Sequence, residues 1–148
     1  MVARDMICCM VSFERDVTVE WGECDPFGLI YFPNILAWFN DTEHTLFAEA
    51  GYSVNRMVEE KTAFVMGRVS FEFVGPVTFG QAVTTVIEIK ELGNSSVTWS
   101  CLARRKMDGV TITEGTATRV YAEILADGSL KAQPIPPALR AVFEQGLS

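Results

Sequence analysis

The spacing of hydrophobic residues changes abruptly about a fifth of the way along this chain. Val17, Val19 and Trp21 alternate with polar residues, which predicts a half-buried strand. From residue 33 to about residue 50, apolar residues recur at the spacing of a helix, and Gly51 is well placed to end it. The apolar positions of this predicted helix are Ile35, Leu36, Phe39, Leu46, Phe47 and Ala50.

After this helix the pattern becomes strand-like. A short helical turn is expected at residues 54–60, and apolar residues then alternate in four stretches that predict strands, near 65–73, 83–89, 97–103 and 110–125. Turn-forming residues separate these stretches at Gly75-Pro76, Leu92–Ser95, Asp108-Gly109 and Asp127-Gly128. Prolines then precede a short helix predicted around residues 139–145.

One long apolar helix followed by a run of antiparallel strands is the layout of an α+β domain. The natural arrangement wraps the sheet around the helix. We expect a single domain over residues 1–148, with a core at about 13–125 and a C-terminal extension at 126–148. A single sheet of this kind leaves one face and one edge uncovered, so pairing with a second copy is expected.

Composition and charge narrow the function classes. Of the 148 residues 49% are hydrophobic, and the formal net charge of −7 argues against a general nucleic-acid surface. No stretch is long enough to span a membrane, and the N-terminus lacks a clear signal-peptide pattern, so it is expected to be a ragged start or an early strand. The spacing of the cysteines and the lone His44 fits neither a disulfide framework nor a zinc site, which predicts reduced thiols, no metal and a cytoplasmic protein. The cysteines are Cys8, Cys9, Cys24 and Cys101.

The segment from Trp21 to Asn34 combines a carboxylate with an unusual helix start. Asp25 lies in the loop between the predicted strand and helix, and Pro33 suits the first turn of the helix. Phe32, just before it, has no side-chain oxygen to cap the free amides, and open N–H groups at a helix start attract negative charge. This arrangement suits acyl transfer, in which one group attacks or activates water and the other holds the oxyanion, although most loops of this composition are simple turns.

The segment reads W-G-E-C-D-P-F-G-L-I-Y-F-P-N and resembles the signature of the 4-hydroxybenzoyl-CoA thioesterase family of hotdog-fold proteins. That family carries an aspartate followed by proline, glycine, an aliphatic pair, aromatics and proline-asparagine just ahead of its central helix. The resemblance continues more loosely through Gly51-Tyr52 and the strand at 70–77. The matching residues of the signature are Asp25, Pro26, Gly28, Leu29, Ile30, Tyr31, Phe32, Pro33 and Asn34.

The resemblance implies a hotdog fold and an acyl-CoA thioesterase. It implies that Asp25 acts on the thioester carbonyl, either as nucleophile or as base for a water molecule. Backbone N–H groups at the start of the central helix would receive the carbonyl oxygen, which maps to Phe32 and, as a second donor, Tyr31. The resemblance also implies edge-to-edge dimers that often assemble further into a homotetramer, with the active site near the subunit boundary. No metal or redox cofactor is implied.

Other carboxylates are the alternatives to Asp25. Glu23 lies two residues away, where a paired carboxylate would raise one pKa, but a solvent-facing charge at the end of a strand is favoured. Asp41, Glu43 and Glu49 lie on the predicted helix, where other branches of the hotdog superfamily carry their catalytic carboxylate. A solvated or interface face is expected for these three residues.

Two further side chains invite a chemical role. Dehydratases and hydratases of the hotdog fold resemble one another in needing a histidine with an acidic partner. His44 lies in mid-helix and far in sequence from the loop, so an exposed or interface histidine is expected. Cys24 has no nearby base in the sequence, and a small buried thiol is the commoner case.

The densest basic run is Arg104-Arg105-Lys106, at the end of a strand beside the Asp108-Gly109 hairpin. It suits the phosphates of coenzyme A, with Lys90 at the end of the neighbouring strand joining it. A charged hairpin tip that discourages aggregation is an equally good reading.

The expected function is hydrolysis of an acyl-CoA thioester. The acyl group is not readable, because Tyr31, Phe32, Trp38 and Phe64 fit an aryl pocket and a core equally well. One alternative is an enzyme acting on an acyl-carrier protein instead of free CoA. The other is a non-catalytic acyl-CoA or small-ligand binding protein, against which the intact Asp25 argues.

Overall fold

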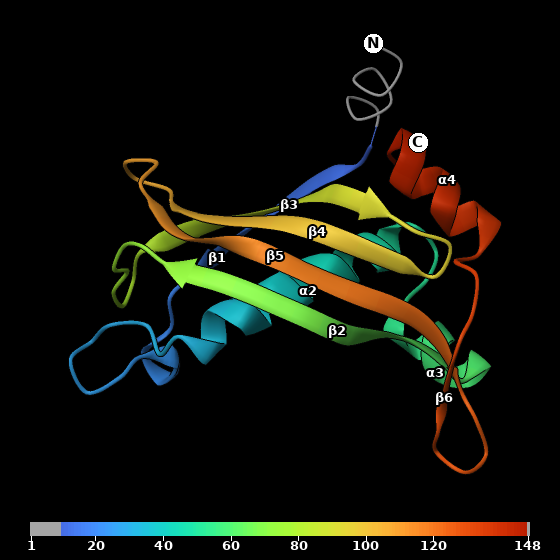
Figure 1. The fold of residues 1–148 in the computed structure, drawn as a ribbon. Coiled ribbons are helices and arrows are strands. Elements are labelled where there is room, and N and C mark those ends of the chain that lie inside the picture. Colours follow the sequence, from blue (N-terminus) through green and yellow to red (C-terminus); the bar gives the residue numbers. More distant parts are fainter. Residues whose placement is uncertain (1–9, 148) are drawn as a thin grey trace.

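The computed structural model describes residues 10–147, in which one antiparallel sheet curves around helix α2 (Figure 1). The strands are β1 (Ser12–Thr18), β2 (Thr62–Phe73), β3 (Ala82–Leu92), β4 (Ser96–Arg105), β5 (Thr111–Ile124) and β6 (Leu130–Ala132). The helices are the short 3-10 turn η1 (Trp21–Glu23), α2 (Pro33–Glu49), α3 (Val54–Glu60) and α4 (Pro137–Gln145).

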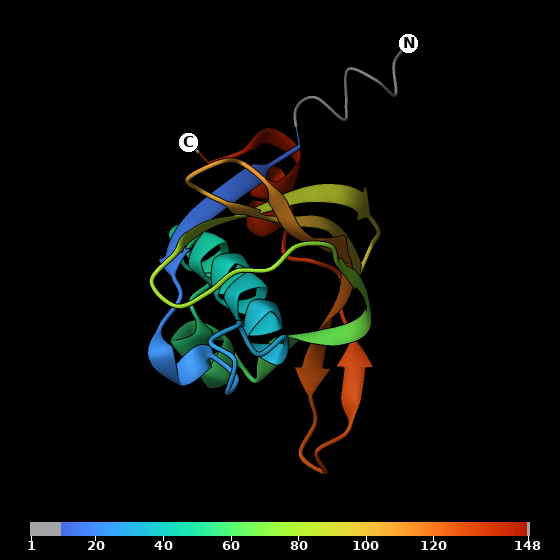
Figure 2. The ribbon, with the colours of Figure 1, turned by 90° about the vertical axis from the view of Figure 1, so that its left-hand side faces the viewer.

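The strand order in the sheet is β1-β3-β4-β5-β2, with β6 paired to β5. Viewed from the side, the sheet curls around α2 so that the helix occupies its concave face (Figure 2). This is the α+β layout that the sequence predicts, with the two hairpins β3–β4 and β4–β5 turning at the expected positions. None of the helices within residues 10–147 has the length and apolar character needed to cross a bilayer.

Helix α2 begins and ends where the sequence predicts. Phe32 is its N-cap and contributes no capping side chain, Pro33 opens the first turn, and Gly51 follows with a φ of 89°, which is accessible to glycine at little cost. The helix buries an apolar stripe that includes Ile35, Phe39, Leu46 and Phe47, together with Trp38, Thr42 and Glu43. The burial of Glu43 is not part of the predicted stripe.

The C-terminal segment completes the core instead of extending from it. Leu139 and Phe143 on α4 are fully buried, and Ile135 is 3% exposed. The ring of Phe143 lies 5.6 Å from that of Trp99 and 6.0 Å from that of Phe47. The expected boundary at residue 126 therefore does not mark the end of the packed core, because side chains of α4 pack into that core.

The first strand lies earlier than its alternation predicts. Strand β1 ends at Thr18, Val19 is fully buried beyond it, and Trp21 opens the η1 turn with 63% of its side chain exposed. The alternation of Val17, Val19 and Trp21 therefore runs past the end of the pairing with β3. The ragged start or early strand expected at the N-terminus falls on residues 1–9, which lie outside the described residues.

Candidate active site

The loop that carries Asp25 is a small hairpin held by backbone hydrogen bonds. The amide of Asp25 donates to the carbonyl of Leu29 at 2.7 Å, and that of Tyr31 donates to the carbonyl of Glu23 at 2.9 Å. Cys24 and Ile30 form an isolated β-bridge between these two bonds. The hairpin places the Asp25 arm alongside the arm that enters α2, so the carboxylate and the helix start are held together by backbone alone.

The Asp25 carboxylate is oriented by its own loop. Its Oδ1 atom accepts the backbone N–H groups of Phe27 at 2.9 Å and Leu29 at 3.1 Å. Such an Asx turn occupies one oxygen and fixes the plane of the carboxylate. Within residues 10–147 no hydrogen bond uses Oδ2 of Asp25, which leaves that oxygen available for chemistry.

The helix start offers one free backbone donor. The amides of Asn34 and Ile35 donate to the carbonyls of Tyr31 and Phe32, at 2.9 and 3.0 Å. The Phe32 amide has no acceptor among the bonds of the described residues, whereas the Tyr31 amide is already bonded to Glu23. The geometry thus agrees with Phe32 as an oxyanion donor. It counts against Tyr31, because an engaged N–H group would have to leave its partner.

Glu23 anchors the loop to the helix, which corrects the expectation of a solvent-facing charge. Its Oε2 atom accepts the indole N–H of Trp38 at 2.7 Å, and its Oε1 atom accepts the amide of Glu20 at 2.9 Å. Its carbonyl also accepts the side-chain amide of Asn34 at 2.9 Å. The buried Trp38 is therefore a structural partner of this loop, a role that only the fold makes visible, because the two side chains are 15 positions apart.

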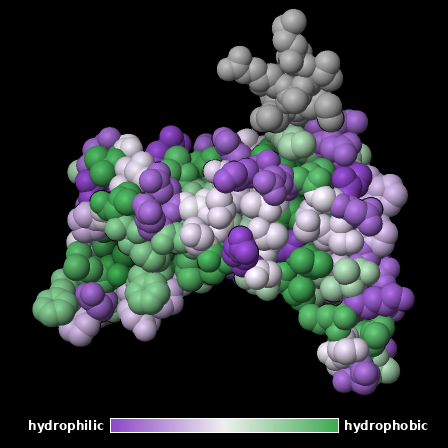
Figure 3. Space-filling view, in the orientation of Figure 1, coloured by the Kyte–Doolittle hydropathy of each residue, from purple (hydrophilic) through white to green (hydrophobic). Residues whose placement is uncertain are grey.

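Aromatic side chains surround the loop and remain exposed. Phe32 lies 5.5 Å from Phe73 and 5.6 Å from Tyr31, measured between ring centroids. Trp21 packs edge-on against Phe79 at 5.6 Å. Figure 3 shows hydrophobic surface gathered at this end of the molecule. Of the four candidates for an aryl pocket, Tyr31 and Phe32 are thus exposed, whereas Trp38 and Phe64 are buried.

The carboxylates on α2 that are alternatives to Asp25 have different environments. Asp41 is exposed and lies 3.7 Å from Arg15, and Glu49 is also exposed, as expected. Glu43 is 1% exposed and pairs with Arg119 on β5 at 2.7 Å inside the protomer, so the solvated or interface face expected for it is wrong. Burial raises the pKa of Glu43, and the guanidinium of Arg119 opposes that rise.

Arg119 is a residue that sequence reasoning missed. Besides Glu43, its guanidinium donates to the side chain of Asn40 at 2.8 Å and to the carbonyl of Phe64 at 3.1 Å. It thereby ties α2 to β5 and β2 inside the core. The sequence holds no local signal for this network, since Glu43 and Arg119 are 76 positions apart.

The side chains of His44, Cys24 and Cys101 make no hydrogen bond to the Asp25 carboxylate. The Nδ1 atom of His44 lies 2.9 Å from the carbonyl oxygen of Asn40, one turn back on α2, and burial lowers the pKa of the imidazole. Cys24 is half-buried and its thiol donates to the carbonyl of Glu20 at 3.5 Å. Cys101 is buried, which raises the pKa of its thiol to about 12. Within residues 10–147 no three metal-ligating side chains cluster.

The basic run is partly consumed by local ion pairs. Arg105 binds Asp108 with two guanidinium nitrogens, at 3.0 and 2.8 Å, and donates to the carbonyl of Pro76 at 2.9 Å. Lys106 pairs with Asp16. Arg104 makes no ion pair or side-chain hydrogen bond within the described part of the chain. It is therefore the member of the run that is free to meet a phosphate.

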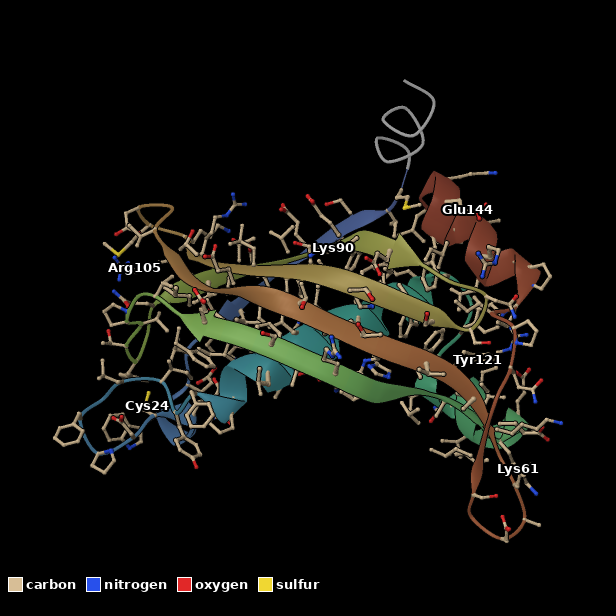
Figure 4. The ribbon with its side chains drawn as sticks, viewed as in Figure 1. Cys24, Lys61, Lys90, Arg105, Tyr121 and Glu144 are labelled. Atoms are coloured by element: carbon tan, nitrogen blue, oxygen red, sulfur yellow. The ribbon has the colours of Figure 1, made fainter. Side chains whose placement is uncertain are left out.

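Lys90 does not join this run, contrary to expectation. Arg104 lies opposite Thr84, whereas Ile89 lies opposite Trp99, because the end of β3 pairs with the start of β4 in an antiparallel hairpin. The six residues from Thr84 to Lys90 correspond to about 20 Å along the strand. Figure 4 shows Arg105 and Lys90 at separate positions along the sheet.

Comparison with known proteins agrees with this geometry. The model of the thioesterase-like superfamily matches residues 19–143. The chain belongs to the thioesterase-like superfamily. The structure accordingly has the hotdog fold that the sequence signature implies, and the membership identifies a thioester hydrolase. No curated protein sequence matches this superfamily member.

Solved structures show how widely the fold is shared. The 1,4-dihydroxy-2-naphthoyl-CoA thioesterase of Synechocystis aligns with a TM-score of 0.81 and 14% identity, covering 90% of this chain and 96% of its own. A mutant 4-hydroxybenzoyl-CoA thioesterase in complex with 4-hydroxybenzoyl-CoA aligns with a TM-score of 0.80 and 20% identity, covering 89% and 98%. A gentisyl-coenzyme A thioesterase aligns with a TM-score of 0.76 and 24% identity, covering 86% of this chain and 98% of its own. At these identities the likeness concerns the fold.

Proposed function

We propose that this superfamily member hydrolyses acyl-CoA thioesters with Asp25 as its catalytic carboxylate and the Phe32 amide as its oxyanion donor. The observation that carries the proposal is the pairing of a free carboxylate oxygen with a free backbone donor on the two arms of one hairpin. Similar solved structures are of enzymes named for acyl-CoA thioesters, which supports coenzyme A as the carrier.

The chemistry needs only these groups and water. In one route Oδ2 of Asp25 bonds to the thioester carbon, the carbon–sulfur bond breaks to release the CoA thiolate, and water hydrolyses the resulting anhydride. In the other route Asp25 takes a proton from a water molecule that attacks the same carbon, and the carbon–sulfur bond then breaks to release the CoA thiolate and the free acid. In both routes the carbonyl oxygen gains negative charge, which the Phe32 amide and the open helix start stabilise. Neither route uses a metal or a redox cofactor.

Strand β2 supports a second copy as partner of the proposed enzyme. It pairs only with β5, so its other edge is unpaired within residues 10–147, and residues 66–70 are exposed on both faces. A bare edge of this length invites another strand. An antiparallel two-fold pairing of β2 with its copy joins the two sheets into one. Two such dimers then form the proposed tetramer. Light scattering tests this proposal, and a stable monomer of 16.4 kDa at micromolar concentration contradicts it.

A substrate screen tests the proposed function. Release of free thiol is followed with aryl, branched and straight-chain acyl-CoAs, and with the same acyl groups on an acyl-carrier protein. Turnover of free acyl-CoA at low micromolar KM supports the proposal. Preference for the carrier-protein thioester favours the first alternative, and tight binding without turnover favours a ligand-binding protein. Arg104, whose side chain has no ion-pair or hydrogen-bond partner among residues 10–147, is the proposed contact for the CoA phosphates.

A further inference from the structure

Buried polar side chains are concentrated at one level of the core. Apart from Tyr, Trp and Cys, five buried residues within residues 10–147 are polar or charged, and four of them form two hydrogen-bonded pairs at the middle of helix α2. The hydroxyls of Thr42 and Thr85 lie 2.7 Å apart, and either can donate. The four residues of this polar belt are Thr42 and Glu43 on α2, Thr85 on β3 and Arg119 on β5.

Arg119 makes the most contacts in the polar belt. Its guanidinium donates to Glu43 at 2.7 Å and to the side chain of Asn40, about one turn earlier on α2, at 2.8 Å. A third bond runs to the carbonyl of Phe64 on β2 at 3.1 Å. The planar fork of one arginine thus holds two neighbouring positions of the helix and a strand of the sheet at the same time.

The polar belt is better suited to fixing a position than to adding stability. Removing a carboxylate and a guanidinium from water is costly, and apolar residues of similar volume often stabilise a core equally well. Apolar packing has no preferred direction, so it tolerates small displacements of the helix, whereas hydrogen bonds weaken steeply with length and angle. The polar belt therefore specifies where α2 lies along the sheet. The apolar residues on either side of it are Ile35, Phe39, Leu46 and Phe47.

The position of α2 along its axis affects the proposed reaction. Asp25 and the Phe32 amide belong to the hairpin that enters α2, so both groups move with the helix. Arg104, the proposed phosphate contact, belongs to β4. A substrate whose CoA part is held at β4 therefore presents its thioester to groups that are carried by α2. An error in the position of the helix becomes an error in the distance of attack.

The helix is attached to the rest of the protein at two levels. At the hairpin, the amide of Ile30 donates to the carbonyl of Val77 at 3.0 Å, in the segment before β3. The polar belt supplies the second attachment, inside the core. Glu43 follows Phe32 by eleven residues, which is about 16 Å along a helix. Because a helix is stiff over this length, the polar belt sets the position of its start.

We propose that Arg119 is a positioning residue for the proposed hydrolysis: through the polar belt it fixes the axial position of α2, and thereby the approach of Asp25 and the Phe32 amide to the thioester. The proposal rests on the proposed function and adds a residue to it. Arg119 is 7% exposed and acts through α2, not on the reacting atoms.

The first experiment replaces the planar fork but keeps its charge. The ammonium of Arg119→Lys cannot reproduce three bonds in fixed directions. With octanoyl-CoA and benzoyl-CoA as probes, kcat should fall about tenfold to a hundredfold, because a displacement of about 1 Å has that effect on attack. KM should stay within about twofold, since the binding contacts persist. Wild-type kcat in Arg119→Lys overturns the proposal.

Thr113→Val is the matched control for this experiment. Thr113 is the fifth buried polar residue, it lies on β5 like Arg119, and its hydroxyl has no hydrogen-bond partner within the described residues. The substitution keeps the shape of the side chain and removes a buried hydroxyl outside the polar belt. Both kcat and KM should equal those of the wild type. A fall in kcat as large as that of Arg119→Lys would show that any polar change in this core impairs turnover, and would overturn the proposal.

The second experiment separates position from stability. Glu43→Leu/Arg119→Met replaces the ion pair with apolar side chains, so its Tm should equal or exceed that of the wild type. Its kcat should nevertheless be as low as that of Arg119→Lys. A role in stability alone predicts that kcat follows Tm, so wild-type values of both overturn the proposal. If the double variant does not fold, Arg119→Lys decides the question by itself.

The third experiment locates the helix without turnover. Crystal structures of the wild type and of Glu43→Leu/Arg119→Met are superposed through β3, β4 and β5. Helix α2 should be displaced along its axis by about 1–2 Å, the size of known helix shifts. An unmoved helix overturns the proposal even if kcat is low. A wild-type protein that hydrolyses no acyl-CoA of the substrate screen overturns the proposed function instead, and the displacement then still decides whether the polar belt fixes α2.

Discussion

The regions at the two ends of helix α2 are held together in different ways. At its start, the Asp25 hairpin is held by backbone hydrogen bonds, and the proposed oxyanion donor is a backbone amide. Towards its other end, a cavity of about 270 Å³ is lined by side chains of α2, α3, β2 and β5. Backbone geometry survives changes of side chain, whereas a side-chain wall changes with every substitution. Single substitutions are therefore expected to reshape the cavity more readily than the Asp25 hairpin.

Among the substitutions, Asp25→Asn should cause the largest loss of activity. The two side chains have nearly the same shape, so the loop and the assembly should persist, but asparagine neither attacks carbon nor takes a proton from water. We expect kcat to fall by at least about a hundredfold, with substrate binding retained. Steady-state kinetics with circular dichroism measure both. Near-normal turnover by folded Asp25→Asn protein would show that the signature is structural.

Arg119→Met tests the buried pair that lies between the two ends. Removing the guanidinium leaves Glu43 buried without a counter-charge, which should lower the free energy of unfolding by about 3–5 kcal/mol. The folded state then favours protonated Glu43, whose pKa burial already raises. The variant should therefore be most stable at acidic pH, and its free energy of unfolding should fall as the pH rises through the raised pKa of Glu43 in the folded state.

Denaturation at pH 5 and pH 8 measures this effect. The deficit of Arg119→Met relative to wild type should be larger at pH 8. The double variant Glu43→Gln/Arg119→Met is the control and should lack most of the pH dependence. An equal deficit at both pH values would mean that Glu43 of the variant does not change its protonation between pH 5 and pH 8, against this expectation.

Arg104→Glu separates carrier recognition from chemistry. A charge-assisted contact contributes about 1.5–3 kcal/mol, so KM for acyl-CoA should rise roughly tenfold to a hundredfold while kcat changes little. The effect should shrink in high salt. Lys90→Glu, about 20 Å away along β3, is the matched control and should leave KM nearly unchanged. Equal KM values for all three proteins would place the phosphate contacts elsewhere.

Glu23→Ala tests the Asp25 hairpin and should have the smallest effect of these substitutions. The change removes the acceptor of the Trp38 indole and loosens the hairpin, so kcat should fall about tenfold with KM little affected. Glu23→Gln keeps an acceptor oxygen and should lose less. Glu49→Ala, which removes an exposed carboxylate from α2, is the control. If Glu23→Ala retains full kcat, the backbone bonds alone hold Asp25 in place.

The local features of this protein were predictable from its sequence. Helix α2, the short helix at Val54–Glu60 and the hairpin turns follow hydrophobic period and turn chemistry, which act over a few residues. The Asp25 loop is similarly local, because its defining hydrogen bonds join residues 23 to 31. Strand β1 was misplaced because alternation continues beyond the end of strand pairing.

What only the tertiary structure decided are the contacts between distant segments. The pairing of Glu43 with Arg119, the burial of Phe143 against Trp99 and the position of Lys90 away from Arg104 each depend on which elements become neighbours. The cavity behind Thr62 likewise needs α2, α3, β2 and β5 together. Local periodicity states that a face is apolar or polar, but long-range packing determines which charges are buried, which donors stay free and where space remains.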